Sequence, residues 1–498
     1  MPHTHQDEAS SQPRLTATQK APRINQIALA SESTPATKKH GPDLLYTSIE
    51  KDLEEIRHDL AKEMEGRWLG AMPVDKFLAK YLPVGEDSEP SPNLPNDLFE
   101  NVPRDGVESQ RYNYFVGTLS SQIHQCYDNI LQIDAVKEWM PNLRAVNTST
   151  KPDKVNGMNL KTDMSVYNRV DGVATSGRTD FSQMELWMEF KANNDGAAFR
   201  DPGNDTDKKR FIEEGSFTPD TEEGWETRGQ LAHYAGAQHS VQFRHFSFSV
   251  FIQGENARFL RWDPSATVVT AAFNYREEPR LMADFLWQFN HLTPEQRGHD
   301  TSVQSVKLPL DVDKRVREKL EIKDNDLPLY RYEIPGMENK GYAYGPRPKT
   351  KNVSLASRCT RSLPVLWIPT EDVDNRAGSC EEPGFLSERG VDQTAGQDKA
   401  KEEPSSKERV IYMKDTWRFL SDSPDVEVLP EHEIYKILYE HGTPNIPEDV
   451  IGGDVDGGRT ENCDLLDDES TMEWLCVQPG VSPFQHYRMV HWIVGYPL

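Results

Sequence analysis

Residues 185–191 read Glu-Leu-Trp-Met-Glu-Phe-Lys and show a clear alternation of side-chain type. Successive side chains of a β-strand point to opposite faces of the sheet. One face of this segment therefore carries three apolar side chains: Leu186, Met188 and Phe190. Trp187, Glu189 and Lys191 lie on the opposite face. The alternation predicts a strand and brings a carboxylate and an ammonium group to the same surface.

Helical and strand patterns interleave on both sides of this strand. Between Leu45 and Met64 the apolar residues recur at steps of three and four, which predicts a helix. The other predicted elements are helices at 74–81, 115–130, 228–243 and 279–291, a short strand around 164–166, a hairpin over 246–262 that turns at Gly254, and a strand at 267–275. This alternation predicts one α/β or α+β domain over residues 43–300.

A second, β-rich domain is expected over residues 328–498, after a charged linker at 301–327. Its strands are predicted near 329–334, 341–346, 355–369 and 409–414. Residues 371–408 and 452–473 are acidic and poor in large apolar side chains, so both are interpreted as solvated, disordered inserts. Residues 1–42 are rich in Ser, Thr, Pro and Gln and are expected to be a disordered tail. The expected fold class is α+β.

Composition limits the kind of protein that this chain can be. Its 498 residues include 56 Lys and Arg against 81 Asp and Glu, a formal net charge of −25. That charge argues against a protein that coats nucleic acid through a basic surface, although it allows a local basic cleft. No apolar run reaches the roughly 18–20 residues of a membrane span, and the first residues lack the apolar core of a secretory signal. We therefore expect an intracellular protein, in cytoplasm or nucleus, with no membrane partner.

Neither cysteines nor histidines indicate a metal site. The five cysteines are scattered and form no C-x-x-C pair, so neither a disulfide framework nor a structural zinc is predicted. Six histidines show no metal-ligand spacing and are interpreted as packing or surface residues: His124, His233, His245, His432, His486 and His491.

The strand at 185–191 belongs to a possible magnesium site. Asp163 precedes a second predicted strand, and pairing of the two strands would bring it close to Glu189 and Lys191. Two carboxylates are hard oxygen ligands for Mg²⁺, and the ion can activate water for phosphodiester cleavage. The lysine can orient that water or stabilise the transition state. We predict Asp163 and Glu189 as metal ligands; the alternative is a half-buried ion pair without chemistry.

These three residues resemble the motif of the PD-(D/E)xK nucleases, with Thr162 where that family prefers proline. Gln230 and Tyr234, four residues apart on the next predicted helix, resemble the Q-x-x-x-Y helix of the RecB-like branch. The resemblance implies that both residues belong to the catalytic site, and it suggests Glu108 as an additional helical acid.

A different motif lies in the second domain. Residues 410–414 read Val-Ile-Tyr-Met-Lys, an apolar strand that ends in Lys414, and a predicted helix follows at 431–438. In protein kinases a strand lysine reaches the phosphates of the nucleotide and pairs with a glutamate of the next helix. Glu431 is the predicted partner and Glu433 the alternative. Residues 487–495 resemble a strand that runs into a hinge, where the backbone of Val494 would bind adenine.

The order of several motifs makes the resemblance more specific. Residues 228–234 read Arg-Gly-Gln-Leu-Ala-His-Tyr, and similar matches occur at 259–263, 293–298, 414–418 and 487–490. Together they resemble the fungal-type protein kinase family over roughly residues 100–498. The family resemblance implies an ATP- and Mg²⁺-dependent enzyme that phosphorylates hydroxyl groups of a protein substrate.

The sequence departs from that family in two respects. The loop at 356–361 contains no glycine where the kinase phosphate loop would lie, and neither H-R-D-x-x-x-x-N nor D-F-G occurs. We therefore expect a truncated, catalytically incomplete kinase-like protein that binds ATP poorly. Two alternatives remain: a Mg²⁺-dependent nuclease acting on nucleic acid, and a non-catalytic interaction scaffold.

Overall fold

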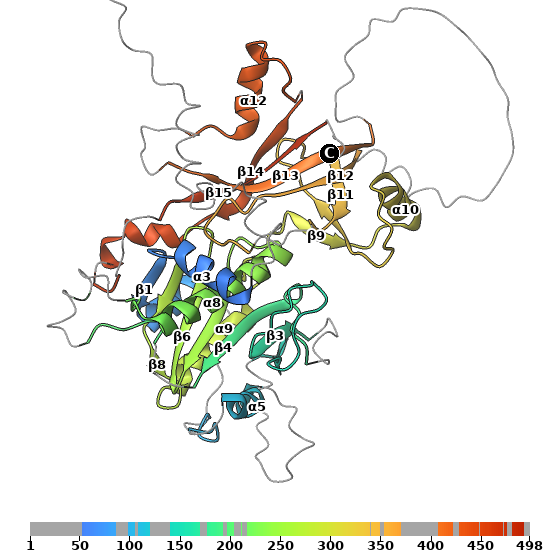
Figure 1. Ribbon diagram of the computed structural model, residues 1–498. Coiled ribbons are helices and arrows are strands. Elements are labelled where there is room, and N and C mark those ends of the chain that lie inside the picture. The colour runs from blue at the N-terminus through green and yellow to red at the C-terminus, as the bar shows by residue number, and fades with distance from the viewer. Residues whose placement is uncertain are drawn as a thin grey trace, which may run out of the picture.

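The computed structural model describes most of both predicted domains, and Figure 1 shows their arrangement. Residues 1–42, residues 371–406 and Val494 lie outside the described part of the chain, so the expectations for them stay predictions. The described residues are 52–85, 98–104, 108–119, 140–169, 177–192, 197–203, 211, 217–338, 340–348, 353–369, 407–421, 428–447, 449–471, 473–475 and 481–492.

The first domain is built on an eight-stranded mixed sheet. Its strand order is β1-β7-β6-β5-β4-β3-β2, with β8 paired to β6. The β1–β7 and β4–β5 pairs are parallel and the others antiparallel. The strands are β1 (Trp68–Met72), β2 (Leu143–Asn147), β3 (Met164–Asn168), β4 (Met184–Lys191), β5 (Ser247–Gln253), β6 (Asn256–Trp262), β7 (Thr267–Thr270) and β8 (Phe273–Asn274). The segment quoted first is therefore a central strand.

Helices cover both faces of this sheet. On one face, α3 (Leu53–Glu63) and α8 (Glu222–Val241) share a core with Trp187 of β4. On the other face, α4 (Val74–Tyr81), α5 (Glu108–Leu119) and α9 (Pro279–His291) pack with Phe190. The alternation along β4 thus determines which core each side chain enters. No helix in the ranges given above combines the length and apolar character needed to cross a bilayer.

The second domain is a seven-stranded antiparallel sheet with the order β14-β15-β13-β12-β11-β10-β9. Helix α10 (Leu310–Lys319) packs on it, and α12 (Glu431–Glu440) lies on the side away from the first sheet (Figure 1). The strands are β9 (Val303–Val306), β10 (Leu329–Tyr332), β11 (Gly341–Pro346), β12 (Arg361–Pro369), β13 (Arg409–Phe419), β14 (Ile451–Arg459) and β15 (Phe484–His491). Two sheets with covering helices confirm a mixed α+β fold.

Two segments differ from the sequence-based expectation. Residues 452–473 were expected as a disordered insert, but they contain most of β14 and the 3₁₀ helices η4 (Asn462–Leu466) and η5 (Glu469–Thr471). Backbone pairing with β15 orders the glycine-rich part, and Leu465 is buried in the core of the first domain. The expected linker at 301–327 likewise contains β9 and α10, because β9 pairs with β10.

Polar side chains connect the two domains. Arg261 of β6 lies with its Nη2 2.7 Å from Oε2 of Glu461, just after β14. Glu63 of α3 accepts a hydrogen bond from the Ser354 hydroxyl, which belongs to the loop between β11 and β12. These contacts link the second domain to β6 and to α3 of the first domain.

Candidate functional sites

Strand pairing brings Asp163 to Glu189. In the antiparallel β3–β4 pair, Met164 is opposite Met188, so Asp163, immediately before β3, continues the register opposite Glu189. Directly opposed side chains of antiparallel strands lie close enough to interact. The two carboxyl groups are hydrogen-bonded to each other, and Asp163 Oδ2 accepts the Phe190 N–H at 2.9 Å. The sequence alone could not determine this register.

All five residues predicted for the nuclease-like site are linked by hydrogen bonds. Lys191 Nζ lies 3.1 Å from Glu189 Oε1 and donates to Gln230 Oε1 at 2.8 Å. Gln230 Nε2 in turn donates to Glu189 Oε1 and to the Tyr234 hydroxyl, at 2.5 and 2.8 Å. Gln230 and Tyr234 share one face of α8 because they are one helical turn apart. The helix therefore holds Glu189 and Lys191 in a fixed arrangement.

The electrostatics of this site show a surplus of acid. Burial, and next the negative charge of Asp163, raise the pKa of Glu189 well above its ordinary value. Burial also raises the pKa of Asp163, although the Phe190 N–H and the Tyr112 hydroxyl oppose the shift. Two buried carboxyl groups beside one ammonium group cannot both ionise cheaply, so they share a proton or require a cation. A divalent cation fits this donor set, since both oxygens are hard ligands.

A pocket of about 550 Å³ lies next to the site, with Lys191 and Gln230 in its wall. Arg57 also lines it, but acidic residues of α3 and α8 predominate: Glu54, Glu222, Glu223 and Glu226. The surrounding field therefore attracts cations and repels an anionic ligand that arrives without one.

One contact at this site was not predicted, and one prediction stays open. Tyr112 of α5 gives a hydrogen bond to Asp163, and no spacing in the sequence links these two residues. Glu108, suggested as a further acid, begins α5, but its side chain lies outside the described part of the structure.

The second site is an ion pair between a strand and the following helix. Lys414 Nζ of β13 lies 2.6 Å from Oε2 of Glu431, the first residue of α12. Arg358, in the loop before β12, also approaches Glu431, with its Nη2 at 3.5 Å. Glu431 and not Glu433 is therefore the partner of Lys414. Two cations face one carboxylate here, so the surplus charge is positive.

The loop between β11 and β12 is held against the first domain. Glu63 accepts hydrogen bonds from the Ser354 hydroxyl and, at 2.7 Å, from the Ala356 N–H. A Cβ atom placed on Gly236 of α8 would lie 1.9 Å from the Val353 carbonyl oxygen, so only glycine allows this approach. The Ala356 N–H and the Val353 carbonyl of this loop therefore contact the first domain.

Comparisons with known proteins give no relative for this chain. No protein-family model matches it, and neither the curated proteins nor the solved structures contain a significant match. The geometry and charge of the two sites therefore provide the basis for inferring a function.

Proposed function

We propose that the second domain is the nucleotide-binding lobe of a kinase-like protein of the fungal type, the family that the sequence resembles. The observation that carries the proposal is the 2.6 Å contact between Lys414 and Glu431. In protein kinases this pairing of strand lysine and helix glutamate positions the lysine for the α- and β-phosphates of ATP.

The order of the elements along the chain supports the same proposal. β11, β12 and β13 are consecutive antiparallel neighbours, α12 follows β13, and β15 lies between β13 and β14. The kinase motifs require a phosphate loop ahead of the lysine strand and a helix that returns a glutamate to that lysine. In the chain, residues 356–361 precede the strand of Lys414, and helix α12 follows it.

The residues fit a nucleotide only in part. Lys414 suits a phosphate group, because it is a point charge with 22% of its side chain exposed. The loop fits poorly, since Ala356 donates its N–H to Glu63 and residues 356–361 contain no glycine. With no H-R-D or D-F-G motif in the printed sequence, the proposal covers weak ATP binding through Lys414 and does not include phosphoryl transfer to a protein substrate.

Titration with ATP in the presence of Mg²⁺ tests this proposal. We expect weak, saturable binding that becomes at least about tenfold weaker in Lys414→Met. Lys436→Met is the matched control, because Lys436 is an exposed lysine of α12. The ATP affinity of this variant should equal that of the unchanged protein. Equal affinity in Lys414→Met, or no saturable binding up to about 10 mM ATP, would contradict the proposal.

A second function is favoured by a separate observation, the convergence of Asp163, Glu189, Lys191, Gln230 and Tyr234. We propose that this site supports Mg²⁺-dependent cleavage of a phosphodiester, with nucleic acid as the substrate class. Asp163 and Glu189 would hold the ion, which when bound lowers the pKa of a water molecule and neutralises developing negative charge.

The other residues of the site have distinct roles in this proposal. Lys191, with 30% of its side chain exposed, can reach a phosphate oxygen from the pocket wall. Gln230 orients both Glu189 and Lys191 through its amide, and Tyr234 fixes the amide by accepting its N–H. Because the pocket is acidic, substrate binding is expected to depend on the cation.

The test is a cleavage assay on single- and double-stranded DNA and on RNA, with and without Mg²⁺. We expect Mg²⁺-dependent cleavage that falls at least about 100-fold in Lys191→Ala, since this lysine faces the developing charge. The control is Lys161→Ala, because Lys161 is an exposed lysine near Asp163 in the chain. Equal rates in Lys191→Ala and the unchanged protein would refute the nuclease function.

A further inference from the structure

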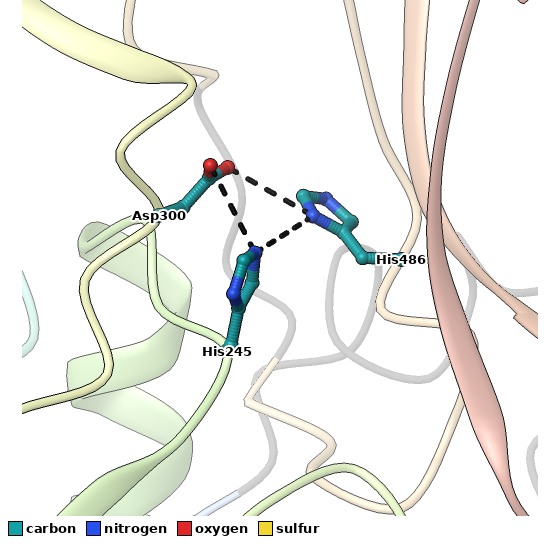
Figure 2. Close-up of side chains that lie close together, drawn as sticks. All are labelled: His245, Asp300 and His486. Atoms are coloured by element: carbon teal, nitrogen blue, oxygen red, sulfur yellow. Dashed lines mark hydrogen bonds and ion pairs between the residues drawn. The ribbon is translucent and has the colours of Figure 1, made fainter. Parts of the chain in front are cut away.

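Three buried side chains from distant parts of the chain converge between the two sheets. His245 lies between α8 and β5, Asp300 lies between α9 and β9, and His486 lies on β15. Figure 2 shows all three pointing toward one another. His245 Nε2 is 3.2 Å from His486 Nδ1, and each of these nitrogens is 3.8 Å from an oxygen of Asp300. This cluster shares no residue with either site described above.

The hydrogen bonds of His486 direct its Nδ1 atom toward His245. His486 Nε2 lies 2.7 Å from Asp415 Oδ1, and a carboxylate can only accept, so Nε2 carries the proton. His486 Nδ1 then accepts the hydrogen bond of His245 Nε2–H, whose proton a bound metal ion would displace. A histidine whose other nitrogen donates to a carboxylate is the usual arrangement of a metal-bound imidazole, with the carboxylate fixing the tautomer.

Carboxylates and arginines surround the two imidazoles. Arg488 Nη2 lies 3.0 Å from Asp300 and its Nε 3.1 Å from Asp415, so one arginine faces two carboxylates. Arg361 adds a second positive charge near Asp415, so the two carboxylates are matched by two arginines. Trp417 stacks on His486 with ring centroids 5.0 Å apart and covers one side of the cluster.

We propose that His245, Asp300 and His486 bind a divalent transition-metal ion of the zinc type between the two sheets. Two imidazole nitrogens and one carboxylate suit zinc better than magnesium or calcium, which prefer oxygen ligands. Zinc bonds of about 2.0–2.2 Å place tetrahedral ligand atoms about 3.3–3.5 Å apart, close to the distances observed. The ion would join β15 of the second domain to the segment between α8 and β5 and the segment between α9 and β9.

The first test is the metal content of the purified full chain after dialysis against zinc and then against metal-free buffer. We expect about one zinc per chain, and less than about a tenth of that in His245→Phe, which keeps a ring against Trp417 but has no ligand nitrogen. His441→Ala, at an exposed histidine, and Glu189→Gln, at the magnesium-type site, should both retain the metal. Asp415→Asn should bind zinc about 10–100-fold more weakly, because it removes the support of His486.

Two results would overturn the proposal: zinc-free protein after loading, or equal zinc in His245→Phe and the unchanged protein. The first would mean that hydrogen bonds and ion pairs alone hold the three side chains together. If His245→Phe does not fold, cobalt substitution of the unchanged protein decides the question. Tetrahedral Co²⁺ gives strong visible absorption, whereas a weak, octahedral-type spectrum or no uptake would contradict the three-ligand site.

Discussion

Each sheet carries a lysine on a strand beside a glutamate, and the two pairs differ in what surrounds them. Lys191 faces Glu189, which is hydrogen-bonded to a second carboxyl group, that of Asp163. Lys414 faces Glu431, which a second cation, Arg358, also approaches. One pair has surplus negative charge and suits a metal ion, while the other has surplus positive charge and suits a phosphate. The balance of neighbouring charges, more than the lysine–glutamate pair itself, therefore indicates the ligand.

Strand β4 repeats this contrast within eight residues. Burial alone would raise the pKa of Glu185, but Arg244, and then His299 and Arg297, lower it well below its ordinary value. Glu189, four residues further on the same face, has the opposite shift because Asp163 adds to the effect of burial. Glu185 is thus a structural carboxylate, and Glu189 is one that lacks sufficient countercharge.

The largest expected change in stability comes from removing the carboxylate of Glu185, which Arg244 compensates. Glu185→Gln leaves Arg244 buried without its ionic partner, and breaking a buried pair in this way costs about 3–5 kcal/mol. Urea unfolding at neutral pH measures this loss. If Glu185→Gln unfolds at the same urea concentration as the unchanged protein, the assignment of Glu185 as a structural ion is incorrect.

A change of opposite sign in the free energy of unfolding is expected at Glu189, four residues further along β4. Glu189→Gln removes a carboxyl group whose ionised form is disfavoured, so at neutral pH it should raise the free energy of unfolding by about 1–2 kcal/mol. The same urea experiment, without divalent cations, gives the value. A loss of stability as large as that of Glu185→Gln would remove the contrast between the two carboxylates.

The pH dependence of stability should show the same contrast. Because the pKa of Glu189 is raised in the folded state, the folded protein holds that proton more tightly than the unfolded chain. Its contribution to stability is therefore fully present below the unfolded value of 4.5 and is lost as pH rises through the native pKa. Glu185 contributes in the opposite direction, since its lowered pKa adds stability above pH 4.5 that is lost as the solution becomes more acidic. Unfolding curves of Glu189→Gln should show a smaller decline with rising pH than the unchanged protein; an identical slope would contradict the raised pKa.

The smallest change in stability is expected at the pair of Lys414 and Glu431. Lys414 and Glu431 are each about one quarter exposed, and partly solvated ion pairs contribute about 1 kcal/mol or less. Lys414→Met should therefore lower the free energy of unfolding only slightly while it weakens ATP binding. A destabilisation above about 3 kcal/mol would indicate a structural role for this lysine.

Several features of this molecule were predictable from the sequence because they depend on local spacing. The alternation in residues 185–191 determines the face of Glu189 and Lys191, and the four-residue step places Gln230 beside Tyr234. The pairing of Lys414 with Glu431 was also predicted, and the two side chains do meet. Both sets of residues lie on regular elements, so their side-chain directions follow from the period of each element.

Features that depend on contacts between distant segments were not predicted. Strand β1 (Trp68–Met72) pairs with β7, and β14 pairs with β15 despite a glycine-rich, acidic sequence, because backbone groups form these ladders. His245, Asp300 and His486 come together only when the two sheets associate. No local pattern distinguishes such residues from ordinary packing or surface positions.

Thermal unfolding with and without Mg²⁺ tests most directly the claim that neighbouring charge selects the ligand. The account predicts that Mg²⁺ stabilises the unchanged protein, by about 2.7 kcal/mol at a concentration about 100 times its Kd. This stabilisation should disappear in Glu189→Gln and persist in Glu431→Gln, the matching change at the other pair. If Mg²⁺ does not stabilise the unchanged protein, or stabilises both variants equally, neighbouring charge does not select the ligand.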